Sequence, residues 1–411
     1  MGDTVKEMAL PFLLRRVELR NYRSIEHCDV ELGPLMFLVG PNGSGKSNFL
    51  DALRFVSDCL NTSVDQALRV RGGFKSVCRV SSQPSNKFSI KLTLDLRRKV
   101  FGRDIVSTCE YFVEIASKGE RAYQISREEF QSTTSPVKFD DALYETNGVA
   151  LVRFQPEDKD LGISHLPEPS VEHLYLRTLD DWPSFQRAYR ALRDMAFYNP
   201  STELIREYQR PDLGDRLDRS ASNLASVFRT LLKTNPDWAE RVLQYLAVVV
   251  PRLQRVVDSD VGERITLQFT EAGSNGESEK TFYASSMSDG TLRMLAILVA
   301  LFQRSEPEQR ISLVAVEEPE MGLHPAAAEV LFDSLNEASA FRQILVTSHS
   351  SELLDHDNVD ADSLLAVSAE SGSTIIGPID DRQKTILKKK LGTAGELLRR
   401  DLLQPNELSH K

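Results

Sequence analysis

The sequence feature that most constrains the fold is the glycine-rich segment 40–47, which reads Gly-Pro-Asn-Gly-Ser-Gly-Lys-Ser. The segment fits the pattern G-x-x-x-x-G-K-[ST] in full. An apolar stretch typical of a strand, residues 36–39, precedes it, and a helical pattern over about 47–60 follows it. Glycines let the backbone wrap closely around phosphate, so that its N–H groups and the helix N-terminus face the anion. The segment therefore predicts a nucleotide-phosphate site in an α/β fold.

Two side chains of this segment have specific expected roles. Lys46 is expected to reach the β- and γ-phosphate oxygens, and Ser47 is expected to ligate Mg²⁺. ATP and Mg²⁺ are therefore the predicted ligands. The residues that we predict to bind the nucleotide in this part of the chain are Gly40, Pro41, Asn42, Gly43, Ser44, Gly45, Lys46, Ser47 and Asn48.

A pair of carboxylates is predicted to complete the site. Residues 313–316 form a short apolar run of the kind buried in a parallel sheet, and Glu317, Glu318 and Pro319 follow it. Because proline cannot continue a central strand, both carboxylates are expected at the carboxyl edge of the sheet, where open α/β sheets bind ligands. Glu317 is placed to hold Mg²⁺ through water, and Glu318 to polarise the attacking water. Taken alone, such a pair is equally typical of a solvated turn.

A third apolar run, residues 343–346, ends in Thr347, Ser348 and His349. It follows the acidic pair at a distance that permits a βαβ crossover, so both strands can lie in one sheet. His349 would then point toward the γ-phosphate and sense it or hold the attacking water. The alternative is a structural histidine at a strand end.

A serine-rich turn precedes the helical pattern over 292–302. Ser288 is a plausible N-cap, which would make this turn only the start of a buried helix. The same physics allows a functional interpretation, because Gly290 permits close backbone approach and a helix N-terminus with a serine hydroxyl is an anion site. The two interpretations are equally supported by these residues alone.

The rest of the chain suggests several lobes. Strand-like alternation covers 12–39 and 74–116, residues 131–170 resemble a long loop or a lobe boundary, and 172–256 have a helical period. We predict four regions: 1–165, an N-terminal ATPase lobe with the phosphate loop and a β-rich subdomain; 166–257, a helical insertion; 258–380, an ATPase lobe with the two further strand ends; and 381–411, a basic helical tail.

Composition excludes several other classes. The longest uninterrupted apolar run, residues 294–302, is half of what a bilayer span needs, and no secretory leader is evident. The four cysteines have neither Cys-x-x-Cys spacing nor a histidine cluster nearby, which favours reduced thiols in the cytoplasm. With 50 basic and 60 acidic side chains the net charge is −10, so contact with nucleic acid would need a local basic patch.

Taken in order, these motifs resemble a known family. GPNGSGKS, then SDGT at a helix start, then VEEPE with GLHP, then TSH are similar to the ABC-type ATPase heads of the SMC/RecF/OLD group. The resemblance is closest to bacterial AAA/ABC-like ATPases often found in antiphage defence loci. It runs from Leu14 to Leu403.

The resemblance implies a role for each motif. Residues 40–47 would be the Walker A loop, and Ser288, Asp289, Gly290 and Thr291 the signature motif. Glu317 and Glu318 would be Walker B, residues 322–324 the D-loop, and His349 the switch histidine. Glu317 replaces the aspartate usual in the family, and His324 stands where transporters and SMC heads carry an aspartate. The Q-loop glutamine is not placed; Gln83 and Gln155 are the two candidates.

The implied fold is an α/β P-loop NTPase, an ABC-type ATPase head with a mixed sheet and a helical lobe. The implied assembly is a head-to-tail dimer in which two ATP molecules lie between the P-loop of one subunit and Ser288 and Gly290 of the other. About 60 residues follow His349, too few for the TOPRIM nuclease that OLD-type proteins append, and no long heptad stretch provides a coiled-coil arm.

We therefore expect a cytoplasmic ATPase that dimerises around ATP and switches a separate effector protein, in bacterial antiphage defence. One alternative is a RecF-like DNA-repair ATPase that acts directly on DNA, and another is a nucleotide-locked scaffold with little turnover. Nucleic acid could bind at basic stretches such as 97–99 and 388–390, although most charge runs are solvated faces. The acidic cluster over 355–362 is interpreted as a solvated loop rather than a metal site.

Overall fold

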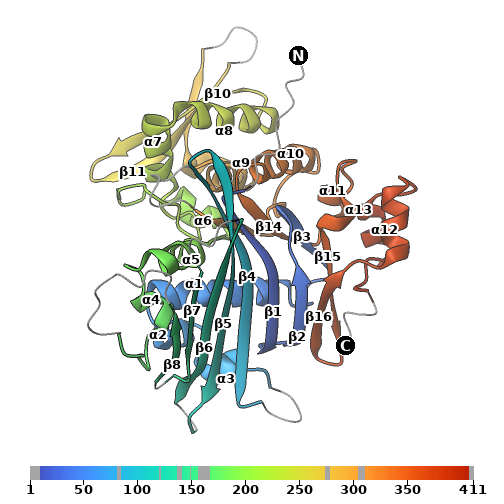
Figure 1. Cartoon of the computed structure of the whole chain (residues 1–411). Helices are drawn as coiled ribbons and strands as arrows, with labels where there is room; N and C mark the ends of the chain where they lie inside the picture. The colour runs from blue at the N-terminus through green and yellow to red at the C-terminus, as the bar shows by residue number, and fades with distance from the viewer. Residues whose placement is uncertain are drawn as a thin grey trace.

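The computed structural model describes residues 10–80, 85–119, 122–136, 141–148, 150–155, 167–273, 278–303 and 311–406. They build one large mixed sheet with helices on both faces and a separate small sheet (Figure 1). The large sheet has thirteen strands in the order β8-β7-β6-β5-β4-β1-β2-β16-β15-β3-β14-β13-β9.

One half of the large sheet is antiparallel. Most of its strands alternate more buried with more exposed side chains, the pattern of a sheet with one solvated face. They are β1 (Phe12–Tyr22), β2 (Ile25–Glu31), β4 (Lys87–Val100), β5 (Arg103–Ser117), β6 (Tyr123–Ser135), β7 (Ala142–Thr146) and β8 (Leu151–Gln155).

The other half contains the parallel strands that position the site. Strands β15, β3, β14, β13 and β9 pair in parallel in that order, and β16 joins them to β2. Strands β13 and β14 are buried on both faces, which explains their continuous apolar sequences. The strands are β3 (Leu35–Val39), β9 (Ala196–Tyr198), β13 (Leu313–Glu317), β14 (Gln343–Ser348), β15 (Leu364–Glu370) and β16 (Ser373–Pro378).

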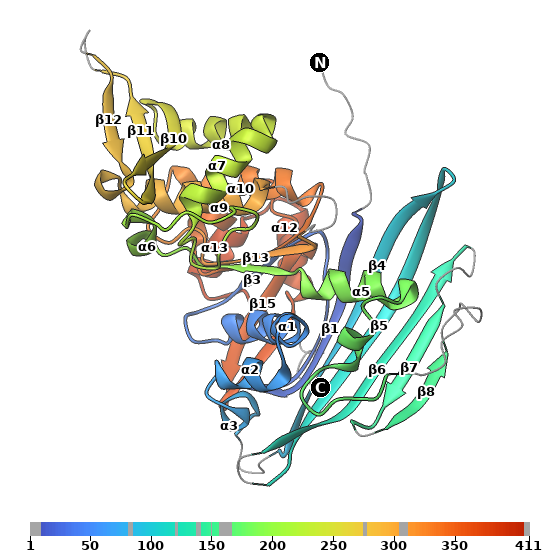
Figure 2. The ribbon, with the colours of Figure 1, turned by 90° about the vertical axis from the view of Figure 1, so that its left-hand side faces the viewer.

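Alternate residues of β3 point into two different cores. Leu38 packs in the core that includes α1 (Lys46–Asn61) and α5 (Pro183–Arg193), and Phe37 packs in the core with α9 (Asp289–Phe302) and α10 (Ala327–Ser339). Figure 2 shows α1 on one side of β3, with α9 and α10 on the other. The first core also contains α2 (Val64–Arg69), α3 (Phe74–Val77) and α4 (Tyr175–Thr178).

A second group of elements stands above α9 in Figure 1. It comprises α7 (Leu224–Thr234), α8 (Pro236–Val249) and a three-stranded sheet of β10 (Leu253–Val261), β11 (Arg264–Glu271) and β12 (Lys280–Tyr283), reached through α6 (Thr202–Arg206). At the C-terminal end lie α11 (Ser351–Leu354), α12 (Asp381–Lys388) and α13 (Ala394–Arg399).

Most predicted elements are present, and three predictions are wrong in part. The strand-like stretch 74–116 begins with the helix α3, and its first strand, β4, starts only at Lys87. The expected loop over 131–170 contains the end of β6 and all of β7 and β8. β7 and β8 have five residues each, too few to show a clear alternation in the sequence. The helical stretch 172–256 is interrupted by β9, because three residues are too few to show a period of two, and its last residues already belong to β10. Among the described helices, none is long and apolar enough to cross a membrane. All four cysteines are buried free thiols.

Candidate nucleotide site

The loop between β3 and α1 has room only for glycine at two positions. A Cβ atom on Gly45 would lie 2.1 Å from Thr374 Oγ1, and one on Gly40 would lie 2.0 Å from the carbonyl oxygen of Val367. Gly45 also has a φ of 108°, a left-handed conformation that favours glycine. The closely wrapped backbone that the sequence predicts is therefore required by the neighbouring strands.

Lys46 lies inside this loop. Its Nζ donates hydrogen bonds to the carbonyl oxygens of Gly40 at 2.8 Å and Pro41 at 3.0 Å, and the residue is 5% exposed. Burial lowers the pKa of Lys46, and the carboxylates of Glu318 and Glu320 act against that shift. Among the described residues, the buried Ser44 Oγ has no hydrogen-bond partner. A buried cation, an unpaired hydroxyl and a glycine cradle fit the phosphates of a nucleotide.

A chain of short polar contacts fixes the loop to the sheet. Thr374 Oγ1 lies 2.8 Å from the carbonyl oxygen of Ser44, and it also contacts Ser24 Oγ at 2.7 Å. Asn48 Nδ2 donates to the same Ser24 Oγ at 2.6 Å. The side-chain amide of Asn48 thus holds the turn between β1 and β2. A direct contact of Asn48 with the nucleotide stays a prediction.

The three predicted strand ends meet at one edge of the sheet. Strand β14 lies between β3 and β13, with Ser348 opposite Val39 and Thr347 opposite Glu317. The chain turns sharply after β13, because Glu318 has a φ of 45° and its backbone N–H bonds to the carbonyl oxygen of Thr347 at 2.9 Å. A left-handed conformation in a residue other than glycine is strained, and such strain concentrates at functional sites.

Glu318 and His349 face each other at this edge. His349 Nδ1 lies 3.5 Å from Glu318 Oε1, and both side chains are partly exposed. Glu320 holds the end of β14, since its Oε1 accepts hydrogen bonds from Ser348 Oγ at 2.6 Å and from the His349 backbone N–H at 3.3 Å. Glu320 therefore orients the histidine, a role that the sequence pattern did not suggest.

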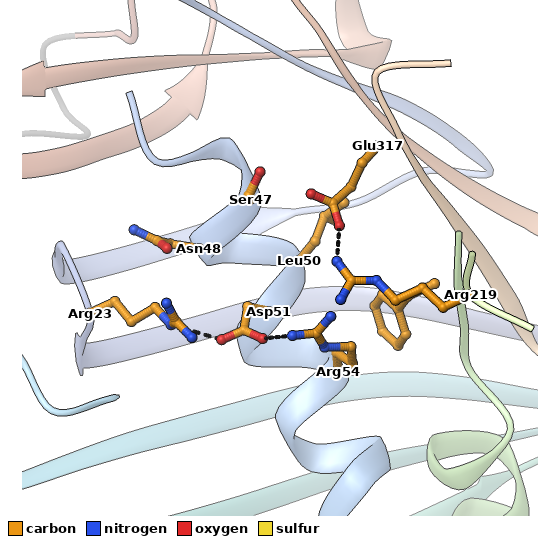
Figure 3. A pocket seen from close by; sticks show the side chains of 9 residues that line it. Arg23, Ser47, Asn48, Leu50, Asp51, Arg54, Arg219 and Glu317 are labelled. Carbon is orange, nitrogen blue, oxygen red and sulfur yellow. Dashed lines mark hydrogen bonds and ion pairs between the residues drawn. The ribbon is translucent and has the colours of Figure 1, made fainter. Parts of the chain in front are cut away.

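A cavity of about 130 Å³ opens beside the loop (Figure 3). Ser47 and Glu317 both line it, as the prediction of a shared metal requires. Glu317 forms an ion pair with Arg219, in which Arg219 Nη2 lies 2.6 Å from Glu317 Oε1. On the far wall Asp51 pairs with Arg23 at 2.8 Å and Arg54 at 2.5 Å. Arg219 was missed because it lies 98 residues from Glu317 in the sequence, in the predicted helical insertion.

A second missed arginine joins α9 to the acidic turn. Arg293 Nη2 donates to the carbonyl oxygens of Glu318 at 3.0 Å and Glu317 at 3.2 Å, and its Nη1 donates to the carbonyl oxygen of Pro200 at 2.8 Å. The residue is 5% exposed, and burial lowers its pKa. Arg293 sits in the apolar helical run, so hydrophobic periodicity gave no sign of its contacts.

The predicted signature turn is exposed at the start of α9. Ser288 is the N-cap, because its Oγ accepts a hydrogen bond from the Thr291 N–H at 3.2 Å. Asp289 pairs with Arg206 at 2.6 Å. A Cβ on Gly290 would lie 2.9 Å from the carbonyl oxygen of Gly322, so the signature turn packs against the segment predicted as the D-loop.

The remaining candidates lie elsewhere. Gln83 falls outside the described residues, and Gln155 ends β8, at the edge of the large sheet opposite β9. In the acidic cluster, Asp355 pairs with Arg399 at 2.6 Å and Asp362 with Lys388 at 2.8 Å. Within the described ranges, no group of three or more histidine, cysteine or acidic side chains could hold a metal ion.

Comparison with known families agrees with this geometry. The model for "AAA domain, putative AbiEii toxin, Type IV TA system" matches residues 137–355, more than half of the chain. The chain belongs to this AAA-domain family. The model for the "AAA ATPase domain" matches residues 13–175 and so includes the P-loop.

Three curated relatives match parts of the chain. The OLD nuclease of Thermus scotoductus is 46% identical over 44 residues, which are 11% of this chain and 8% of that protein. The DNA replication and repair protein RecF of Phocaeicola vulgatus is 36% identical over 66 residues, 15% of this chain and 18% of that one. Endonuclease GajA of Bacillus cereus is 22% identical over 346 residues, 82% of this chain and 55% of the relative. The chain thus spans about half of the GajA length and much less of the others.

Two solved structures show the same fold. The Smc head bound to the C-winged helix domain of ScpA has a TM-score of 0.55 at 14% identity, covering 90% of this chain and 99% of that one. The Smc head with an extended coiled coil from Pyrococcus furiosus, bound to the C-terminal domain of ScpA, has a TM-score of 0.50 at 12% identity, covering 92% and 99%. The predicted P-loop NTPase fold of the SMC/RecF/OLD type is confirmed.

Proposed function

We propose that this protein binds ATP with Mg²⁺, hydrolyses it, and uses the cycle to switch its own association and a separate effector protein. The observation that carries this proposal is the meeting of Lys46, Glu318 and His349 at one sheet edge, with Glu318 held in a strained turn. Mg²⁺, when bound, would neutralise phosphate charge and orient the phosphates. Ser47 and Glu317 are the residues that would hold it.

In this proposal the other residues of the site act directly on the phosphates or on the attacking water. Lys46 stabilises negative charge on the terminal phosphates from inside the glycine loop. Glu318 accepts a hydrogen bond from the attacking water and takes its proton, and His349 orients that water or contacts the γ-phosphate. The backbone N–H groups of 40–47 hold the other phosphate oxygens.

We propose further that the signature turn binds the nucleotide of a second copy. The start of α9 combines a serine hydroxyl, a glycine and a helix N-terminus in an exposed turn, which suits an anion. Within its own chain, the Ser288 hydroxyl contacts Thr291 of the same helix turn. A head-to-tail pair would therefore place each signature turn over the P-loop of the other copy.

Replacing Ser288 by Arg tests this arrangement. We expect Ser288→Arg to abolish ATP-dependent dimerisation, because a long cation would fill the exposed turn, while one copy still binds fluorescent ATP through its P-loop. The mass of the particle with and without ATP, measured by light scattering, is the readout. Ser339→Arg, which adds the same side chain at the end of α10, should dimerise normally. Normal ATP-dependent dimerisation of Ser288→Arg would refute the in-trans assignment.

The arginine on Glu317 gives a second prediction. Because Arg219 neutralises the carboxylate expected to hold the metal, Arg219→Ala should lower the Mg²⁺ concentration needed for half-maximal ATP binding. Partly exposed ion pairs contribute about 0.2–1 kcal/mol, so the expected change is roughly 1.5- to 5-fold. Fluorescent ATP titrated with Mg²⁺ measures it. Arg54→Ala, on the other wall of the same cavity, should leave the value unchanged. Weaker ATP binding by Arg219→Ala would instead make Arg219 a phosphate ligand.

The biological role that we propose is antiphage defence. The names of the relatives support an association with nucleases and DNA repair, and the family description refers to a toxin–antitoxin system. We expect the chain, expressed together with its effector, to lower phage plating efficiency, and Lys46→Ala to remove that protection. Protection that survives Lys46→Ala would exclude a nucleotide-driven role.

A further inference from the structure

The hairpin formed by β4 and β5 extends beyond the strands on either side of it. In the described part of the chain, β1 pairs with β4 as far as Leu96, with one further hydrogen bond from the Arg97 N–H to the Pro11 carbonyl oxygen, and β6 pairs with β5 as far as Val106. Beyond these points β4 and β5 pair with each other through Arg98 with Ile105, Lys99 with Asp104 and Val100 with Arg103. Figure 2 shows this end of the hairpin standing clear of the rest of the protein. The exposed end of this two-stranded ribbon thus comprises Lys99 and residues 101–104, and its base is formed by the half-buried Arg97 and Arg98 and by Ile105, which is 4% exposed.

An aromatic side chain occupies the tip of this ribbon. Phe101 is 99% exposed, more than any other large hydrophobic residue among those described. Phe101 and Gly102 have φ values of 49° and 78°, so both central residues of this two-residue turn are left-handed. Such turns prefer Asn-Gly, and phenylalanine is strained at this position. The tip therefore carries a residue that favours neither solubility nor the stability of the turn.

Basic side chains flank the aromatic tip on both faces of the ribbon. Side chains alternate along a strand, so Arg98 and Arg103 lie on one face, and Arg97 and Lys99 on the other. Asp104 is the one acidic residue between positions 97 and 105. The ribbon is thus strongly positive, although the whole chain has a net charge of −10.

We propose that this ribbon enters the major groove of duplex DNA. The major groove, about 12 Å wide and about 8.5 Å deep, admits a two-stranded ribbon. The cations extend over about 10 Å back from the tip at about 3.4 Å per residue, which matches a groove whose two walls carry phosphates. A flat anionic membrane would contact only the tip. Phe101 would contact thymine methyl groups at the groove floor, the apolar groups that bases present in the major groove.

The test is DNA binding by the full chain without nucleotide, so that it does not depend on the ATPase proposal. Binding of a short labelled duplex is followed by fluorescence anisotropy over a range of salt concentrations. We expect Phe101→Asn to weaken binding by at least about 5-fold, because the ring no longer buries apolar surface against the groove floor, with little change in salt dependence. Its melting temperature should equal or exceed that of the parent, because Asn-Gly suits the turn. Lys99→Ala should instead reduce the slope of log affinity against log salt by about 1.

Two substitutions on the C-terminal tail serve as controls. Leu391 is 73% exposed and Lys389 belongs to another basic run, so Leu391→Asn and Lys389→Ala should bind DNA like the parent. Lys46→Ala should also bind DNA like the parent, which separates this proposal from the nucleotide site. Absence of DNA binding at low salt, or unchanged binding by Phe101→Asn, would overturn the proposal. Phe101-dependent binding to phosphatidylserine vesicles without DNA binding would also overturn it and assign the ribbon to membranes.

Discussion

Replacing Glu318 by Gln is expected to slow ATP hydrolysis by about 10²- to 10⁴-fold, the usual contribution of a general base. Glutamine has the same shape, so the hydrogen bond of the residue 318 N–H to Thr347 and the strained turn are preserved. The amide cannot take a proton from water, but the P-loop is untouched. ATP binding should therefore remain, and an ATP-bound dimer should accumulate. Phosphate release measures the first effect, and light scattering with ATP measures the second.

The matched control is Glu329→Gln on the exposed start of α10, which should hydrolyse ATP at the parental rate. Comparing Glu318→Gln with Glu329→Gln also decides whether the protein needs repeated ATP hydrolysis or acts as a nucleotide-locked scaffold. If Glu318→Gln still protects cells from phage, turnover is dispensable and the scaffold alternative is correct. If Glu318→Gln hydrolyses ATP normally, then the water is activated by another group and our assignment of the base is wrong.

Replacing Lys46 by Ala should have the largest effect on nucleotide affinity. Lys46 is nearly buried in the loop, where its ammonium group bonds to two backbone carbonyl oxygens. Hydrogen bonds to charged groups contribute about 1.5–3 kcal/mol, so loss of this cation should weaken ATP binding by about 10- to 150-fold. Equilibrium binding of fluorescent ATP is the measurement, and hydrolysis should fall with occupancy.

Lys75→Ala provides the comparison, because Lys75 is an exposed lysine on α3. It should bind ATP with parental affinity. Burial lowers the pKa of Lys46, so its removal also relieves a buried charge, and Lys46→Ala should unfold at a temperature no lower than the parent without ATP. Parental ATP affinity in folded Lys46→Ala would place the phosphates outside this loop.

The parts of the site that the sequence predicts are those specified by short segments. The loop 40–47, the acid pair and His349 each follow a buried strand directly, so a local pattern marks both the residue and its place at the sheet edge. Arg219, Arg293 and Thr374 reach the site from distant segments, and no local pattern relates them to it. Their contacts depend on the tertiary arrangement of the sheet and of α9.

The same distinction holds for the fold. Strands with clear alternation, such as β4, were predicted, whereas β9 was not, because its three residues form a strand only along the edge of β13. The exposure of the end of the β4–β5 hairpin could not be predicted from the sequence either. Its basic residues are visible in the sequence, but the ends of β1 and β6 that leave it exposed follow from sheet register.

The position of β3 has a consequence for how the protein is made. Its two neighbours in the sheet, β14 and β15, are both synthesised after residue 342, about 300 residues later than the P-loop strand itself. At a translation rate of about 5–20 residues per second, both edges of β3 remain without their partner strands for about 15–60 s after β3 is synthesised. Unpaired strand edges invite pairing with other chains. The nascent protein therefore needs protection during that interval, and it cannot assemble its nucleotide site until β14 and β15 have been synthesised.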